Sequence, residues 1–486
     1  MKEKLGDMPI EEFKKQGHML IDWIADYLDN IEKYPVLAQI KPGDVKSKLP
    51  AEPPAEGEEF TEFMKDVDDI IMPGMTHWNH PNFMAYFNST GTGPGILAEL
   101  LSGAFNINGM LWKSSPAATE LEEVTLGWLR QMLKLPEDFW GIIYDGAANS
   151  TMHALAAARE YASDLNVRQK GMAGRSDIPR LRVYASEQAH NSIDKGALTI
   201  GIGLDGIRHI PVDKNFSMIA AELEKAIKED VDNGWYPLCV VVSIGTTSTT
   251  SIDPLPEIGR ICKANNIWLH VDAAHAGTAA IVPEMRYILN GIELADSLVV
   301  NPHKWMGIPI DLSTFFTNKP EVLRGAFSLS AEYLKTKEDA SVENYMDYGI
   351  QLGRRFRSLK LWFVIRYFGV NGIIDRLKDN LRLAQLVKKK VEENSHFELL
   401  APVPLSTVCF RVNYEGKTDE VLNELNANLM HRVNATGKVF LSHTVLNGKF
   451  AIRFVVSSFK TMESHVELAW NTILETFEEL KKEKKI

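Results

Sequence analysis

The chain has 486 residues, of which 45% are hydrophobic and 24% are charged, and its formal net charge is −11. This is the composition of a globular protein with a large core, and the acidic balance argues against a nucleic-acid or anionic-membrane partner. The three cysteines, Cys239, Cys262 and Cys409, lie far apart, so we expect buried, reduced thiols rather than a disulfide framework or a zinc site.

The amino-terminal segment MKEKLGDMPIEEF lacks the apolar stretch that a secretory signal needs. No part of the chain contains the roughly 18 uninterrupted apolar residues of a membrane span. We therefore expect a cytoplasmic protein that does not enter a membrane.

The first part of the chain predicts a helical arm, which we assign to residues 1–86. Residues 13–31 place apolar side chains at helical spacing, and residues 41–60 hold four prolines and several charges, which favours an extended connection. Because one helix cannot bury its own apolar stripe, we expect it to pack on another part of the molecule or on a second subunit.

From about residue 85 to 320, short apolar runs alternate with amphipathic ones. These runs predict strands at 181–186, 238–245, 267–274 and 297–301, and helices at 115–133, 148–162, 218–229 and 255–266. Continuous apolar strands that alternate with helices predict a mostly parallel sheet covered on both faces. We expect this α/β domain to span residues 87–372.

The C-terminal part has a different pattern. A long helical stretch near 353–394 is followed by strand-like segments at 397–415 and 449–458 and by a helix at 462–482. We expect residues 373–486 to form a smaller α+β domain.

Polar side chains follow several of the predicted strands. Asp272 ends one strand, Thr246 and Thr247 follow another, and Asn301 and Lys304 follow a third. Each has an ordinary structural explanation, such as a helix cap, a turn or a solvated loop. Their combination is more informative, because the carboxyl ends of parallel strands are where an open α/β sheet binds its ligands.

A helix that begins at about Ala147, directly after the turn Asp145–Gly146, offers free backbone N–H groups to a phosphate. With Lys304 and Asp272, this helix start suits pyridoxal phosphate, whose aldehyde bonds to a lysine and whose ring nitrogen pairs with an acid. A metal site that uses Asp272 and nearby histidines (His270, His275, His303) is the competing interpretation. No HxxxH spacing is present, so we expect no metal.

The motifs HWNHPNFMAYF (77–87), SPAATELE, HVDAAHAG, NPHKW, AEYLK and LGRRFRSLKLWFV belong to a match that runs from residue 77 to the C-terminal domain, nearly the whole chain. They resemble the group II pyridoxal phosphate-dependent amino acid decarboxylases, in the aromatic L-amino acid decarboxylase branch. The resemblance implies an aspartate aminotransferase-like (fold type I) fold and an intertwined homodimer with shared active sites.

The resemblance also assigns roles to particular positions. The residues that match cofactor-binding positions are Lys304, Asp272, Thr247, Ala148, Asn149, Asn301, His190 and Gly353. Lys304 matches the lysine that carries the cofactor, Asp272 the acid at the ring nitrogen, and His190 the histidine that stacks on the ring near the substrate carboxylate. Ala148 and Asn149 match the phosphate turn, and Gly353, with Arg354, matches positions that approach the partner's cofactor.

Tyr333 distinguishes two chemistries within the family. It matches a loop tyrosine that donates a proton to the substrate carbon after carbon dioxide has left, so Lys304, Tyr333 and His190 are the expected catalytic residues. Relatives with phenylalanine at this position consume oxygen and release an aldehyde, because a phenyl ring has no proton to give.

The substrate side is less strongly determined. Trp78, Tyr86 and Phe87, together with His190, match positions around the substrate. The chain departs from the family pattern at Asn88–Ser89–Thr90, where proline is usual, at Met110–Leu111, and at His275, where tyrosine is usual. These departures leave open which aromatic amino acid is preferred.

We therefore expect decarboxylation of an aromatic L-amino acid to the amine and carbon dioxide. Three alternatives remain: oxygen-consuming aldehyde synthesis, decarboxylation of a non-aromatic amino acid, and a catalytically silent dimer that binds the cofactor or a partner protein.

Overall fold

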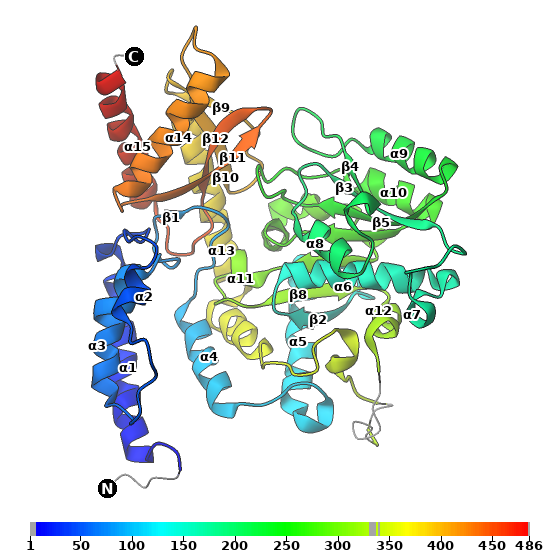
Figure 1. Cartoon of the computed structure of the whole chain (residues 1–486), viewed down its shortest axis with the longest axis horizontal. Coiled ribbons are helices and arrows are strands. Elements are labelled where there is room, and N and C mark those ends of the chain that lie inside the picture. The colour runs from blue at the N-terminus through cyan, green and yellow to red at the C-terminus, as the bar shows by residue number, and fades with distance from the viewer. Residues whose placement is uncertain (1–5, 330–336, 339–340, 485–486) are drawn as a thin grey trace.

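The computed structural model describes residues 6–329, 337–338 and 341–484, and two β-sheets organise them (Figure 1). The larger sheet has seven strands in the order β2-β8-β7-β6-β5-β3-β4. The strands are β2 (Trp140–Tyr144), β3 (Arg180–Ser186), β4 (Ile207–Ile210), β5 (Trp235–Ser243), β6 (Trp268–Asp272), β7 (Ser297–Val300) and β8 (Ser313–Thr317). Strands β4, β3, β5, β6 and β7 pair in parallel, whereas β8 is antiparallel to β7 and β2. The predicted mostly parallel sheet is confirmed.

Helices cover both faces of this sheet. The covering helices are α5 (Pro116–Leu133), α6 (Ala147–Tyr161), α8 (Ser192–Thr199), α9 (Ala220–Asp232), α10 (Leu255–Asn265) and α12 (Pro320–Phe327). Side chains alternate along each strand, so Val240 and Val242 of β5 join one core with α5, α9 and α10. Val241 joins a second core with α6, α8 and α12. Both faces are therefore buried, which explains the continuous apolar strands.

The smaller sheet has the strand order β1-β11-β12-β10-β9. Its strands are β1 (Phe83–Met84), β9 (Phe397–Leu399), β10 (Thr407–Val412), β11 (Phe440–Leu446) and β12 (Lys449–Val455). Helices α14 (Asp419–Ala435) and α15 (Glu463–Lys484) pack with it around a core of its own. The predicted α+β domain is confirmed, although the segment 397–415 forms two strands, separated by Pro402 and Pro404.

Helix α13 (Ser358–Glu392) connects the two sheets (Figure 1). Gly369, at φ 64°, interrupts it with a residue outside the helical region. The expected division at 372/373 falls within α13, and this boundary, like that at 86/87, stays a prediction. Strand β1, which pairs in parallel with β11, was not foreseen and joins the segment before the large domain to the small sheet.

The N-terminal arm contains α1 (Ile10–Asp29), α2 (Asp44–Lys48) and α3 (Phe60–Asp66), which lie together at one side of the molecule in Figure 1. The expectation of an extended segment over 41–60 was partly wrong, because α2 forms where Asp44 accepts the Lys41 N–H at 2.8 Å and caps a short turn. No side chain of α1 is buried, and Phe13 is 56% exposed. Its apolar stripe is therefore only partly covered in a single chain.

The remaining helices are α4 (Gly93–Phe105), α7 (Val167–Lys170) and α11 (Pro302–Trp305). Within the described ranges, no helix combines the length and the apolar character needed to cross a bilayer. All three cysteines are buried and free, as expected.

Candidate active site

The predicted site residues meet at the carboxyl edge of the larger sheet. Strands β5 and β6 pair Ser243 with Asp272, and β6 and β7 pair Asp272 with Val299. Asn301 follows β7 directly, and its carbonyl accepts the Lys304 N–H at 2.9 Å in the short helix α11. Because these strands are parallel neighbours, they bring Asp272 and Lys304 to one edge.

Asp272 and Lys304 line one cavity. About 400 Å³ of space around them, part of it open to solvent, is filled by no protein atom. The lining residues are Phe87, Ala147, His190, Ser243, Gly245, Thr246, Thr247, Asp272, Ala274, His275 and Lys304. The expected lysine, acid and histidine are thus brought together with Thr247 and Phe87.

The surroundings of Lys304 make its ammonium group easier to deprotonate than that of a solvated lysine. Burial lowers the pKa of the Lys304 ammonium, and the Asp272 carboxylate partly opposes this effect. A lysine whose pKa is lowered releases its proton more readily, which an amine must do before it can bond to a carbonyl carbon. The Asp272 carboxylate is held at the cavity wall because its Oδ1 accepts the Ala274 N–H at 3.1 Å.

His190 lies in the loop between β3 and α8. Its Nδ1 accepts the Ser192 N–H at 3.1 Å, so the neutral ring carries its proton on Nε2. Desolvation lowers the pKa of His190, the Asp272 carboxylate raises it, and the Lys304 ammonium lowers it. The imidazole is thereby coupled to both charged groups of the cavity.

The start of α6 fits a phosphate. Ala147 of its first turn lines the cavity, and the first N–H groups of a helix have no partner within the helix. Ala148 and Asn149 belong to the same turn, where Asn149 Nδ2 donates to Asp145 Oδ1 at 2.7 Å. The Asn301 Oδ1 atom is buried and lacks a hydrogen-bond partner within the described parts of the chain. An amine, an acid and a phosphate cradle around one cavity suit pyridoxal phosphate.

Sequence reasoning missed Arg453 and Gly245. Arg453 of β12 donates to the carbonyls of Thr247 (2.7 Å) and Ser248 (3.0 Å), so the small sheet anchors the Thr247 turn. A charged residue within the apolar run KFAIRFVV was a signal for this role. Gly245 has a φ of +84°, and a Cβ there would lie 2.4 Å from that of Ala276, so the turn requires glycine.

Other predicted residues lie away from this cavity. Trp78 and Tyr86 stack on each other at 6.0 Å and are 41% and 50% exposed. Gly353 is also exposed, whereas the Arg354 side chain is turned into its own subunit and pairs with Glu122. Tyr333 lies outside the described residues.

The histidines of the competing metal interpretation have other partners. His270 Nδ1 lies 2.9 Å from Ser297 Oγ, and His303 Nδ1 accepts the Leu312 N–H at 2.9 Å. Burial lowers the pKa of each of these two histidines to about 4. In the part of the chain that the structure describes, no group of three His, Cys, Asp or Glu side chains is arranged to hold a metal ion.

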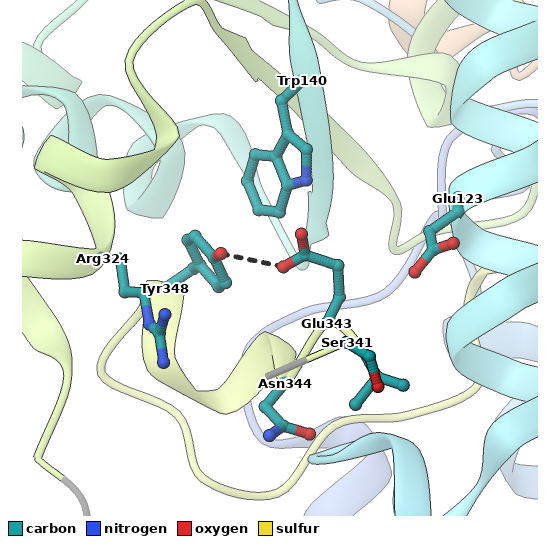
Figure 2. A pocket seen from close by; sticks show the side chains of 8 residues that line it. Glu123, Trp140, Arg324, Ser341, Glu343, Asn344 and Tyr348 are labelled. Carbon is teal, nitrogen blue, oxygen red and sulfur yellow. Dashed lines mark hydrogen bonds between the residues drawn. The ribbon is translucent and has the colours of Figure 1, made fainter. Parts of the chain in front are cut away.

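A second hollow lies beside Trp140 and Tyr348 (Figure 2). The Tyr348 hydroxyl donates to Glu343 Oε2 at 2.8 Å, and Arg324 pairs with Asp347. None of the predicted site residues lines this hollow. The candidate site is therefore the cavity at Lys304.

Residues 42–413 match the family described as "Pyridoxal-dependent decarboxylase conserved domain". The chain belongs to this decarboxylase family. The decarboxylase is 39% identical to tryptophan decarboxylase 2 of Oryza sativa subsp. japonica, over 97% of this chain and 95% of that protein. It is also 39% identical to the phenylacetaldehyde synthase of a Rosa hybrid cultivar, over 95% of this chain and 93% of the relative.

Among solved structures, that of Oryza sativa TDC with PLP and tryptamine has a TM-score of 0.93 and 35% sequence identity. The match covers 98% of the decarboxylase and 100% of the other chain. The expected fold type I architecture is confirmed, and the protein is a carboxy-lyase that uses pyridoxal phosphate.

Proposed function

We propose that the decarboxylase removes the carboxyl group of an aromatic L-amino acid and releases the amine and carbon dioxide. One observation carries the proposal: Lys304 and Asp272 share a cavity with the rings of Phe87 and His275. Aromatic walls suit an aromatic side chain, and the similarity to tryptophan decarboxylase 2 supports the same substrate class.

Each residue of the cavity would have a separate role in the reaction. Pyridoxal phosphate, when bound, supplies an electron-withdrawing ring that accepts the electrons of the broken bond. Lys304 would hold the cofactor covalently until the amino acid displaces it, and Asp272 would keep a proton on the ring nitrogen. His190, whose Nε2 carries its proton, would pack on the ring and orient the substrate carboxylate.

The remaining contacts would hold the cofactor in place. The first turn of α6, with Ala147, Ala148 and Asn149, would bind the phosphate through backbone N–H groups. Asn301, with its unpartnered buried oxygen, and Thr247, held by Arg453, would close the other side. Such fixed contacts orient the reacting bond relative to the ring before reaction begins.

The test is a panel of the standard and hydroxylated aromatic amino acids, with the remaining standard amino acids as controls. Purified enzyme saturated with pyridoxal phosphate should release carbon dioxide and the matching amine from aromatic substrates. Carbon dioxide from glutamate or another non-aromatic substrate, and none from the aromatic ones, would refute the proposal.

A second candidate function is the synthesis of an aromatic aldehyde. It is favoured because the phenylacetaldehyde synthase and the tryptophan decarboxylase are equally similar to this chain. An aldehyde-forming enzyme would consume oxygen and release ammonia and hydrogen peroxide. Tyr333 supports amine formation, since a phenol can donate the proton that completes it. Measuring aldehyde and peroxide beside amine separates the two candidates, and stoichiometric aldehyde would favour the second.

We further propose a homodimer with shared active sites. The partly covered stripe of α1 supports it, as do the exposed Leu97, Leu100 and Phe105 of α4. In this arrangement, the exposed Gly353 would approach the cofactor of the other subunit. Light scattering during gel filtration should give twice the mass of the 54.6 kDa chain; a monomer that is fully active would contradict the sharing.

We also propose that the protein works in the cytoplasm. The free thiols of Cys239, Cys262 and Cys409 support a reducing compartment. Fractionation of the native cell with an antibody against the chain is the test, and recovery from a secreted or organellar fraction would contradict the proposal.

A further inference from the structure

His275 links the cavity wall to the protein interior through aromatic stacking. Its ring centroid lies 3.8 Å from that of Phe87, with 10° between the planes. It lies 4.8 Å from that of Trp305, with 5° between the planes. The His275 side chain is only 2% exposed. Phe87, which lines the cavity, is thus continuous with the buried Trp305.

This stack is anchored on the side away from the cavity. Trp305 Nε1 donates to Asn380 Oδ1 at 2.9 Å, and Asn380 Nδ2 donates to the Ser458 carbonyl at 3.0 Å. His275 Nε2 lies 3.2 Å from Ser406 Oγ, just before β10 of the small sheet. These hydrogen bonds fix the plane of the His275 ring, and with it the plane of Phe87.

Phe87 in turn lies beside the reactive amine. The Lys304 Nζ atom is 5.7 Å from the centroid of its ring, and Arg453 Cζ is 5.4 Å from the same centroid. A tilt of the Phe87 ring would therefore change the shape of the cavity close to Lys304, where the substrate must bind.

The His275 imidazole is suited to stack as a neutral ring. Burial lowers its pKa, and the nearby cations Lys304 and Arg453 lower it further. Its Nδ1 atom is buried and makes no hydrogen bond to the described residues. The His275 side chain therefore acts through the stacking of its ring on Phe87 and Trp305 and through its contact with Ser406.

We propose that His275 is a positioning residue that sets the choice among aromatic amino acids by holding Phe87 as a rigid wall of the substrate cavity. This rests on the proposed aromatic decarboxylation. A rigid wall discriminates ring size, and hydrophobic pockets typically separate substrates that differ by one methylene by about 10- to 200-fold. If the Phe87 ring can tilt, the cavity admits the larger indole ring and no longer discriminates between aromatic amino acids of different ring size.

Two variants of similar size separate stacking from hydrogen bonding. His275→Leu removes the flat ring, whereas His275→Phe keeps it, and both remove the ring nitrogens. We expect His275→Leu to raise the ratio of kcat/KM for tryptophan to that for phenylalanine by about tenfold, mainly through KM. His275→Phe should retain nearly the wild-type ratio.

A third variant, Ser406→Ala, removes only the contact to His275 Nε2 and keeps the flat ring, so its ratio should lie close to that of His275→Phe and well below that of His275→Leu. Cofactor absorbance at equal protein concentration checks that each variant binds pyridoxal phosphate. Equal ratios for the leucine and phenylalanine variants, or an unchanged ratio in His275→Leu, would overturn the proposal. If the wild-type enzyme releases carbon dioxide from no aromatic amino acid, the proposed function itself fails, which is a distinguishable result.

Discussion

Replacing Arg354 with methionine should destabilise the protein far more than the same change at its neighbour Arg355. The Arg354 side chain is 6% exposed and that of Glu122 is 5% exposed, and Nη2 lies 2.6 Å from Glu122 Oε1. The same nitrogen donates to the Ile143 carbonyl at 2.9 Å, while Glu122 Oε1 accepts the Ile143 N–H at 2.9 Å. One buried ion pair therefore joins α5, β2 and the segment before α13.

The magnitude follows from this geometry. Arg354→Met leaves the Glu122 carboxylate buried and unpaired, which costs about 3–5 kcal/mol. Arg355 pairs with Glu99 but is 57% exposed, and Glu99 keeps its contact with Lys360. Arg355→Met should therefore cost at most about 1 kcal/mol.

The assay is urea unfolding at fixed protein and cofactor concentrations, followed by tryptophan fluorescence. Adding Glu122→Gln to Arg354→Met removes the stranded charge and should restore part of the lost stability, by about 1–3 kcal/mol. Equal losses for Arg354→Met and Arg355→Met would refute the reasoning, as would a double variant that is no more stable than Arg354→Met alone.

Three further outcomes are expected. Lys304→Ala should abolish turnover and the visible absorbance of bound pyridoxal phosphate, and retention of both would make the lysine structural. Tyr333→Phe should divert product from amine toward aldehyde, measured by chromatography with peroxide detection; unchanged amine output would remove this phenol from the reaction. Burial raises the pKa of Asp253 from 3.8 to about 6, so the folded state holds its proton more tightly and the contribution of Asp253 to stability falls as pH rises through this window. Asp253→Asn should make the urea midpoint nearly independent of pH across the same range. At pH 7 the variant should lose about 1–3 kcal/mol of stability, because the Met218 and Ser243 N–H groups each donate to one carboxylate oxygen and an amide offers only one oxygen.

The sequence alone determined the features that depend on local pattern. Continuous apolar runs identified β3, β5, β6 and β7, because strands buried on both faces cannot alternate with polar residues. The polar residues that end these runs, Asp272 and Lys304, also follow from the sequence, since parallel strands deliver their carboxyl ends to one edge of the sheet.

Some predictions failed because a single residue overrode the structure that the surrounding composition or periodicity predicts. The proline-rich segment 41–60 was expected to be extended, yet Asp44 starts the short helix α2. Helix α13 begins at Ser358 rather than near residue 353, and Gly369 interrupts it. Periodicity detects neither a single carboxylate that closes a turn before a helix nor one glycine at positive φ.

Only the tertiary structure decided which distant residues meet. Phe87 and His275 lie far apart in the chain, and their stacking depends on how β1 pairs with β11 and how the turn after β6 is packed. The same is true of Arg453 at the Thr247 turn and of Arg354 with Glu122. Periodicity reports which side of an element is buried, because burial follows from solvent exclusion along that element. The partner that covers it is set by close packing of the whole chain, which no single segment encodes.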